Sequence, residues 1–268
     1  MTDRTTEPVL RVTGVGLTFN AGLVNETVAL ADVTLDVRRS EFVVVLGSNG
    51  AGKSTLMNAI AGVHLPDHGR IELAGEDITR LVDHRRARRI GRVFQDPMAG
   101  TAGSLSIFEN LVLAERRCAR RRFRVPHKVE HHRAALAELG MGLEDRLSAR
   151  VDTLSGGQRQ ALAVLMAIQA APDLLMLDEH TAALDPAAAE RVLEVTALLA
   201  DEGHITTLMI THNMSHAIEL GTRTVMMHRG RVLFDLDSEQ RAGLTVSDLI
   251  ERFRSLAADD LSDRTALG

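Results

Sequence analysis

The stretch Gly47-Ser-Asn-Gly-Ala-Gly-Lys-Ser54 decides how the rest of this sequence is interpreted. It follows the continuous apolar run Phe42–Leu46 and precedes helix-forming residues 53–62, so it joins a buried strand to a helix. Glycines let successive backbone N–H groups turn inward around an anion, and the helix N-terminus and Lys53 add positive charge. The pattern G-x-x-x-x-G-K-[ST] in this context predicts a phosphate-binding loop in which the Ser54 hydroxyl holds Mg²⁺.

Further apolar runs predict a mainly parallel sheet around this loop. Residues 174–177 and 206–210 each end in polar side chains, and helices are predicted between them at 156–170 and 186–201. Repeated strand–helix–strand order is typical of an α/β fold. By contrast, residues 104–152 contain amphipathic helical stretches and no buried strand, which indicates an inserted helical subdomain.

The two ends of the chain carry simpler patterns. Alternating residues at 9–19 and 28–37 predict a pair of N-terminal strands, and residues 225–234 predict a second pair that turns at Arg229-Gly230. A capping box formed by Thr245 and Asp248 starts a short helix. Residues 257–268 are expected to be loose.

Charged side chains follow the apolar run 174–177. Asp178 and Glu179 repel each other there unless a cation is bound. Beside a phosphate site, Asp178 would orient Mg²⁺ or its water, and Glu179 would polarise a water that attacks the γ-phosphate. The alternative is an exposed acidic turn. His212 follows the neighbouring strand, where a histidine is either structural or aimed at the phosphate.

A second candidate anion site lies at Leu154-Ser-Gly-Gly-Gln158, which opens the helix predicted at 156–170. Small residues and bare N–H groups stand there at a positive helix end. One ATP needs only one phosphate cradle, so the economical arrangement is a head-to-tail dimer in which this helix end closes on the partner's nucleotide. On their own, the same residues also fit a glycine-rich helix cap.

Together these motifs resemble the ATP-binding subunit of ABC (ATP-binding cassette) transporters, over roughly residues 9–235. The resemblance implies an α/β fold: a P-loop NTPase ABC ATPase core with an N-terminal antiparallel β-subdomain and an inserted α-helical subdomain. It places the nucleotide-binding core at 1–95 and 153–235, the helical subdomain at 96–152, and a C-terminal helix and tail at 236–268.

The resemblance also assigns roles to residues. The implied catalytic residues are Lys53, Glu179 and His212. The implied Mg²⁺ ligands are Ser54, Gln95 and Asp178. Gln95 would also sense the membrane partner, and Ala183-Leu184-Asp185 would lie at the dimer seam. The implied ATP contacts are Phe19, Ser48, Asn49, Gly50, Ala51, Gly52, Lys53, Ser54, Thr55, Gln95, Ser155, Gly156, Gly157, Gln158 and Asp185.

Two departures from the family pattern bear on this site. His180 follows Glu179 where family members commonly carry proline, which puts the stiffness of the local backbone in question. The adenine-stacking position holds Phe19 where tyrosine is usual. Phe19 is either the base platform or a core residue, and aliphatic packing from side chains such as Val28 is the alternative way to hold the base.

Composition limits the partners. Among 268 residues, 31 Lys and Arg stand against 36 Asp and Glu, and this net charge of −5 argues against a general nucleic-acid-binding or membrane-coating surface. The seven Phe, with no Trp or Tyr, offer few positions for base stacking. One cysteine, Cys118, allows no intrachain disulfide, which favours the cytosol. Because no apolar run could span a bilayer, a separate integral membrane permease is expected.

Two clusters leave alternatives open. The arginines at 116, 117, 120, 121, 122 and 124 fit a solvated face, attraction to anionic headgroups or, least well, nucleic acid. His127, His131 and His132 have metal-like spacing, but no acid or cysteine completes a ligand set, so a metal is not expected.

The leading hypothesis is therefore an ATPase that binds ATP and Mg²⁺ and drives a permease from the cytoplasmic face of the membrane. The expected partners are a second copy or a paralogous ATPase subunit, the permease and an extracytoplasmic solute-binding protein, with no nucleic acid. Import of a small solute, such as an amino acid, is expected. The alternatives are a soluble scaffold ATPase for cofactor assembly and a regulatory module that binds nucleotide without hydrolysis, which Glu179 and His212 disfavour.

Overall fold

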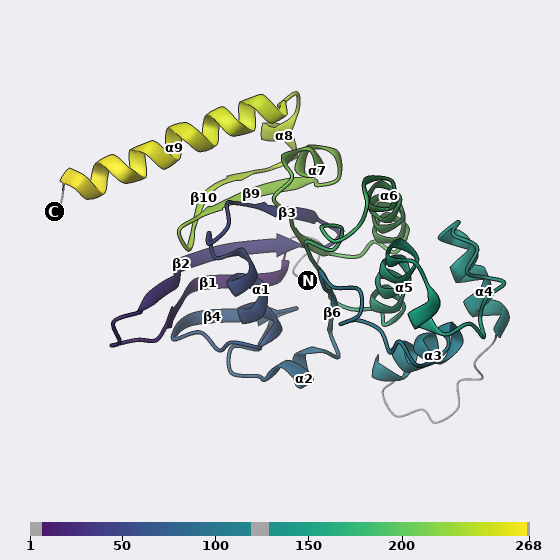
Figure 1. Cartoon of the computed structure of the whole chain (residues 1–268). Coiled ribbons are helices and arrows are strands. Elements are labelled where there is room, and N and C mark those ends of the chain that lie inside the picture. Colours follow the sequence, from purple (N-terminus) through teal and green to yellow (C-terminus); the bar gives the residue numbers. More distant parts are fainter. Residues whose placement is uncertain (1–6, 119–128, 267–268) are drawn as a thin grey trace. The chain divides into compact units, whose positions relative to one another are not determined.

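The computed structural model describes residues 7–118 and 129–266. The chain folds as two compact units. The first combines Met1–Asp83 with Leu208–Gly268, and the second is His84–Thr207. Helices and strands carry the same labels here as in Figure 1.

The first unit contains the predicted antiparallel sheet, in the strand order β2-β1-β4-β5. The paired strands β1 (Pro8–Phe19) and β2 (Thr27–Arg38) confirm the N-terminal prediction, and they lie side by side in Figure 1. The strands β4 (His68–Leu73) and β5 (Glu76–Asp77) were not predicted. In β4 the first three residues are exposed, so no alternation marks it in the sequence.

The same unit contains the strands around the phosphate loop. Strand β3 (Phe42–Leu46) is buried throughout and pairs in parallel with β9 (Arg223–His228). Strand β10 (Arg231–Leu236) runs antiparallel to β9 through a turn at Arg229-Gly230, as predicted. Both turn residues have positive φ, 46° and 77°, as a tight hairpin requires. Strand β8 (Thr207–Ile210) follows β3 in the strand order.

Helices of the first unit are α1 (Lys53–Ala61), α7 (Met214–Glu219), α8 (Ser238–Arg241) and α9 (Val246–Ala266). The capping box is confirmed, because the Thr245 and Asp248 side chains each accept the other's backbone N–H. The expectation of a loose segment at 257–268 is wrong as far as Ala266, where α9 ends. No glycine or proline interrupts 246–266, so nothing in the sequence stops the helix earlier.

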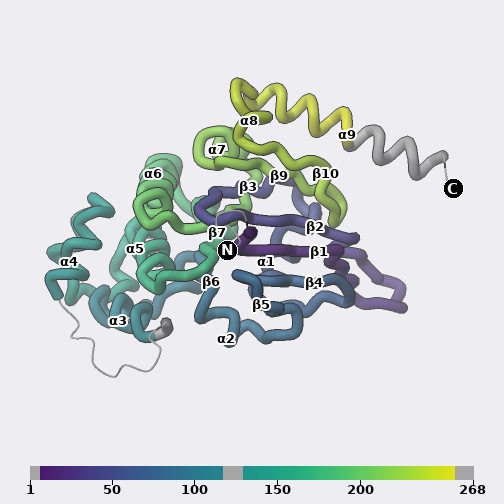
Figure 2. Tube along the Cα trace, turned by 180° about the vertical axis from the view of Figure 1, so that it is seen from behind, coloured from purple at the N-terminus to yellow at the C-terminus, as the bar shows by residue number. Residues whose placement is uncertain are grey.

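The second unit pairs strand β6 (Ile90–Val93) in parallel with β7 (Leu174–Asp178). Helices α3 to α6 gather into one group in Figure 2, and α5 contacts α3, α4 and α6. The helices of this unit are α2 (Asp83–Arg86), α3 (Ile107–Cys118), α4 (Val129–Glu138), the 3₁₀ turn η1 (Val151–Thr153), α5 (Gly156–Gln169) and α6 (Pro186–Glu202). The predicted helices at 156–170 and 186–201 are therefore confirmed to within a residue.

The limits of the second unit differ from those of the predicted helical subdomain, 96–152. The unit also holds β6, β7, α5 and α6, because the inserted helices pack against α5. The functional division into core and helical subdomain stays a prediction. Within the residues that the structure describes, no helix is both long and apolar enough to cross a membrane.

Candidate functional site

The phosphate loop has a conformation that only glycine can adopt at two positions. Gly47 has φ 155° and Gly52 has φ 98°. A Cβ on Gly47 would lie 2.5 Å from the Met227 carbonyl oxygen, and one on Gly52 would lie 2.6 Å from that of Ala29. Backbone oxygens cannot move aside as a side chain can. The glycines therefore set the path of the loop.

Lys53 places a cation over this loop. Its side chain is buried, at 5% exposure, and Nζ donates hydrogen bonds to the carbonyl oxygens of Gly47 at 2.7 Å and Ser48 at 3.1 Å. Helix α1 begins at the same residue, so its first N–H groups have no acceptor within the helix. Ser48, Asn49, Gly50 and Ser54 are exposed around it. A buried ammonium at a helix N-terminus fits a polyphosphate.

Phe19 lies at the end of β1, half-buried, with its ring edge-on to His64 at a centroid distance of 5.3 Å. Val28, on the paired strand, is 55% exposed. Both side chains are thus at least partly accessible. The choice between Phe19 and aliphatic packing as the base platform stays a prediction.

His212 follows β8 in the first unit and is exposed. The next residue, Asn213, caps α7, and its Nδ2 lies 3.0 Å from His216 Nε2. Burial lowers the pKa of His216, Glu219 opposes that shift, and the nearby His212 adds to it. The short helix α7 therefore carries a partly buried histidine, with a pKa below its ordinary value, near the exposed His212.

In the second unit, β7 ends at Asp178 as predicted, and Asp178 is paired with an arginine that sequence reasoning missed. Arg92 Nη2 lies 3.2 Å from Asp178 Oδ2, with the two side chains 14% and 17% exposed. The guanidinium carbon lies 4.7 Å from the ring centroid of Phe94. Arg92 and Phe94 stand two residues apart, and this spacing puts two side chains on the same face of a strand. This two-residue spacing was the only feature of the sequence that could have pointed to Arg92.

The turn after Asp178 is compact. Glu179 is half-buried and has a φ of 43°, in the left-handed region that non-glycine residues rarely adopt. Its carbonyl accepts the Ala182 N–H at 2.9 Å. Asp185 ends the turn and caps α6, because its side chain accepts the Ala188 N–H at 3.0 Å. Asp185 therefore has a structural role within the chain, and its position at a dimer seam stays a prediction.

The second predicted anion site is built as a capped helix start. Ser155 and Gln158 form a reciprocal capping box at the beginning of α5, and Gln158 Nε2 also donates to the Met141 carbonyl at 3.2 Å. A Cβ on Gly157 would lie 3.0 Å from Ala188 Cβ, and one on Gly156 would lie 3.1 Å from Leu184. The helix-cap interpretation is thus observed. An anion-binding role for the N–H groups stays a prediction.

The predicted Mg²⁺ ligands lie in different units, Ser54 in the first and Gln95 and Asp178 in the second. Gln95 is exposed two residues after the end of β6. All three offer oxygen atoms, the donors that Mg²⁺ prefers, so their chemistry fits this ion. Among residues 7–118 and 129–266, no group of three His, Cys, Asp or Glu side chains is arranged to hold a metal.

The histidine and arginine clusters are only partly described. His132 is buried, with its ring edge-on to Phe108 and its Nε2 3.6 Å from a Glu115 carboxylate oxygen, whereas His131 is exposed. His127 and the arginines at 120, 121, 122 and 124 lie outside the described residues. The arginine cluster therefore keeps the alternatives stated above.

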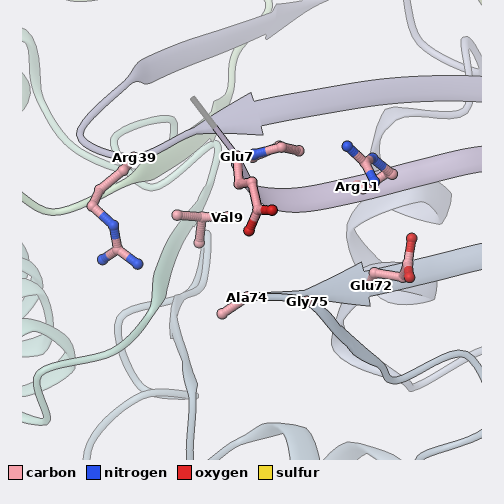
Figure 3. A pocket seen from close by; sticks show the side chains of 8 residues that line it. Glu7, Val9, Arg11, Arg39, Glu72, Ala74 and Gly75 are labelled. Atoms are coloured by element: carbon pink, nitrogen blue, oxygen red, sulfur yellow. The ribbon is translucent and has the colours of Figure 1, made fainter. Parts of the chain in front are cut away.

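A polar hollow of about 740 Å³ lies elsewhere in the first unit (Figure 3). Glu7, Arg11, Arg39 and Glu72 contribute its charged side chains, and Arg11 also pairs with Asp36 at 3.5 Å. The lining includes none of the predicted site residues. The hollow therefore adds nothing to the candidate nucleotide site.

Comparisons with known proteins agree with the fold and the motifs. The family model described as ABC transporter matches residues 30–182. The chain is 40% identical over 83% of its length to the tyrosine transport ATP-binding protein of Clostridioides difficile, covering 89% of that protein. It is 37% identical over 76% of its length to a sulfate/thiosulfate import ATP-binding protein of Chromobacterium violaceum, of which it spans 56%.

A solved structure gives the same result. It is the dimeric post-hydrolysis state of an ATP-binding cassette bound to ADP and phosphate, with a TM-score of 0.73 and 26% identity over 85% of this chain and 98% of that one. A nucleotide-binding α/β fold with a phosphate loop and a strand that ends in Asp178-Glu179 defines a P-loop ATPase. The chain belongs to the ABC transporter family, as an ATP-binding ATPase subunit.

Proposed function

We propose that this chain is the motor of a small-solute transporter and that it drives a separate integral membrane permease from the cytoplasmic side. It works as a head-to-tail pair, with a second copy or a paralogous ATPase subunit, around two composite ATP sites. The observation that carries the proposal is the phosphate loop, whose path is set by Gly47 and Gly52 and whose buried Lys53 faces two loop carbonyls. The dimeric cassette with ADP and phosphate supports the pairing.

Each site residue has a chemical task in this proposal. Lys53 and the loop N–H groups stabilise negative charge on the phosphates, and His212 contacts the γ-phosphate. Glu179 polarises the attacking water. Ser54, Gln95 and Asp178 hold Mg²⁺, which neutralises phosphate charge when it is bound. Ser155, Gly156, Gly157, Gln158 and Asp185 serve the partner's nucleotide.

We infer import as the direction of transport. One relative is a tyrosine transport protein and the other a sulfate/thiosulfate import protein. The solute of this system is a small molecule such as an amino acid, selected by the permease and an extracytoplasmic solute-binding protein. Copurification of the chain with a polytopic membrane protein from detergent-solubilised membranes supports this assignment. Recovery with only soluble partners would favour the scaffold ATPase.

The catalytic assignment is tested by Glu179→Gln, which removes the charge that polarises water and keeps the shape of the side chain. We expect hydrolysis to fall by about 100-fold or more while binding of a fluorescent ATP analogue is unchanged. The control is Glu190→Gln, the same change at an exposed position on α6. Normal hydrolysis by the Glu179 variant would remove Glu179 from the mechanism.

The base platform is tested by Phe19→Ala beside Val28→Ala. Loss of an aromatic stacking surface should weaken ATP binding about fivefold or more. If only the Val28 variant binds ATP more weakly, the base is held by aliphatic packing.

A further inference from the structure

His180, the residue directly after Glu179, is buried and hydrogen-bonded to another element. Its side chain is 2% exposed. The ring atom Nε2 lies 3.3 Å from the hydroxyl oxygen of Thr196, which is fully buried in α6. The contact therefore joins the turn after β7 to the interior of a helix.

The direction of this hydrogen bond follows from the number of protons that the Thr196 hydroxyl can donate. Thr196 Oγ1 donates to the Val192 carbonyl oxygen at 2.7 Å, one turn earlier in α6. A hydroxyl group has a single proton to give, so its oxygen can only accept from the ring. His180 Nε2 is consequently the donor. A chain of two bonds runs from the imidazole through the hydroxyl to the helix backbone.

The residue before His180 needs such support. Glu179 has a φ of 43°, and its carbonyl closes the turn by accepting the Ala182 N–H. Left-handed backbone at a non-glycine residue is unfavourable and persists only where the surroundings hold it. The other end of the same turn is held by Asp185 at the start of α6. His180 thus attaches the Glu179 end of the turn to the helix that already anchors its other end.

We propose that His180 is a positioning residue that holds the Glu179 carboxylate in place for hydrolysis through its hydrogen bond to Thr196. This buried contact ties the turn after β7 to α6. The proposal rests on the proposed role of Glu179. It assigns His180 no contact with ATP, so nucleotide binding should not depend on it.

The test removes the acceptor and keeps its shape. Thr196→Val removes the oxygen that accepts from His180 Nε2, and we expect kcat for ATP hydrolysis to fall about tenfold. KM and the affinity for a fluorescent ATP analogue should stay within about twofold, because only placement of Glu179 is affected. Thr196→Ser keeps the hydroxyl and should restore kcat.

The matched control is Thr207→Val, the same change at another fully buried threonine, whose hydroxyl donates to the Ile205 carbonyl at 3.1 Å. It should leave kcat unchanged. His180→Leu removes the donor and keeps apolar volume, so it should match Thr196→Val, and combining the two should cause no further loss. If Thr196→Val does not fold, His180→Leu compared with Thr196→Ser gives the same test.

The outcomes distinguish a failure of the proposed function from a failure of the role proposed for His180. If Glu179→Gln hydrolyses ATP normally, the proposed function fails and the role of His180 falls with it. If hydrolysis depends on Glu179 but Thr196→Val behaves like Thr207→Val, the role of His180 alone is wrong. Equal losses of kcat and ATP affinity, without rescue by Thr196→Ser, would show a contribution to folding only and overturn the proposal.

Discussion

The phosphate loop and the turn that carries Glu179 both follow a buried strand, but different interactions hold them in shape. The loop takes its path from its own residues, because Gly47 and Gly52 have φ of 155° and 98° and Lys53 Nζ bonds the carbonyls of Gly47 and Ser48. The turn is held from outside, by the pair Arg92–Asp178, 86 residues apart, and by the contact between His180 and Thr196, 16 residues apart. Local sequence therefore specifies the loop, whereas tertiary contacts specify the turn.

The largest expected effect comes from a substitution in the phosphate loop, at a position with no room for a Cβ atom. Gly52→Ala forces a Cβ to within 2.6 Å of the Ala29 carbonyl and places alanine at a φ of 98°. We expect ATP affinity, measured by isothermal titration calorimetry, to fall about 100-fold or more, because the loop N–H groups are displaced from the phosphates.

The control for backbone strain alone is Gly75→Ala, because Gly75 has a φ of 79° and open space around its Cα. That variant should lose about 1 kcal/mol of unfolding free energy and keep its ATP affinity. Equal ATP affinities for the two variants would mean that the close contact at Gly52 does not set the path of the loop.

A smaller effect tests the dependence of the turn on a distant partner. Arg92→Gln leaves the largely buried Asp178 carboxylate without its cation, and we expect the free energy of unfolding to fall by about 2 kcal/mol in urea titrations. Arg89→Gln, directly before the same strand, is the matched control. Arg89 pairs with Asp173, but those side chains are 30% and 35% exposed, so the loss should stay below about 1 kcal/mol. Equal losses of unfolding free energy in the two variants would show that burial does not increase the contribution of the Arg92–Asp178 pair to stability.

The same contrast explains what the sequence could predict. Features that depend on consecutive residues were predicted: the strand–loop–helix order around the phosphate loop, the turn at Arg229-Gly230 and the capping box at Thr245. Each depends on local backbone chemistry, which a single stretch of sequence contains.

Features that depend on partners far along the chain were missed. Arg92 was not recognised as the partner of Asp178, and nothing in residues 186–201 marked Thr196 as an acceptor for His180. The departure at His180 was noticed, but its consequence needed the position of α6. The end of α9 was misjudged for a different reason, because polar residues after 256 were interpreted as loose although no helix breaker is present.

The smallest expected effect is on the pH dependence of stability, and it compares α7 of the first unit with the Glu179 turn of the second. Burial lowers the pKa of His216 below its ordinary value of 6.5, and the charge of His212 acts in the same direction against Glu219. The unfolded chain therefore binds a proton at His216 more tightly than the folded chain does. Stability should therefore fall as the pH drops through 6.5 towards the folded-state pKa and stop falling below it.

His216→Gln removes this titration, so its unfolding free energy, measured in urea between pH 8 and pH 5, should change less with pH than that of the wild type. Thr196→Val, which alters the turn of the second unit, should keep the wild-type dependence, because threonine does not titrate. A His216 variant with an unchanged pH slope would place the acid sensitivity at other histidines. A slope altered only in the Thr196 variant would place the pH sensitivity in the Glu179 turn and not in α7.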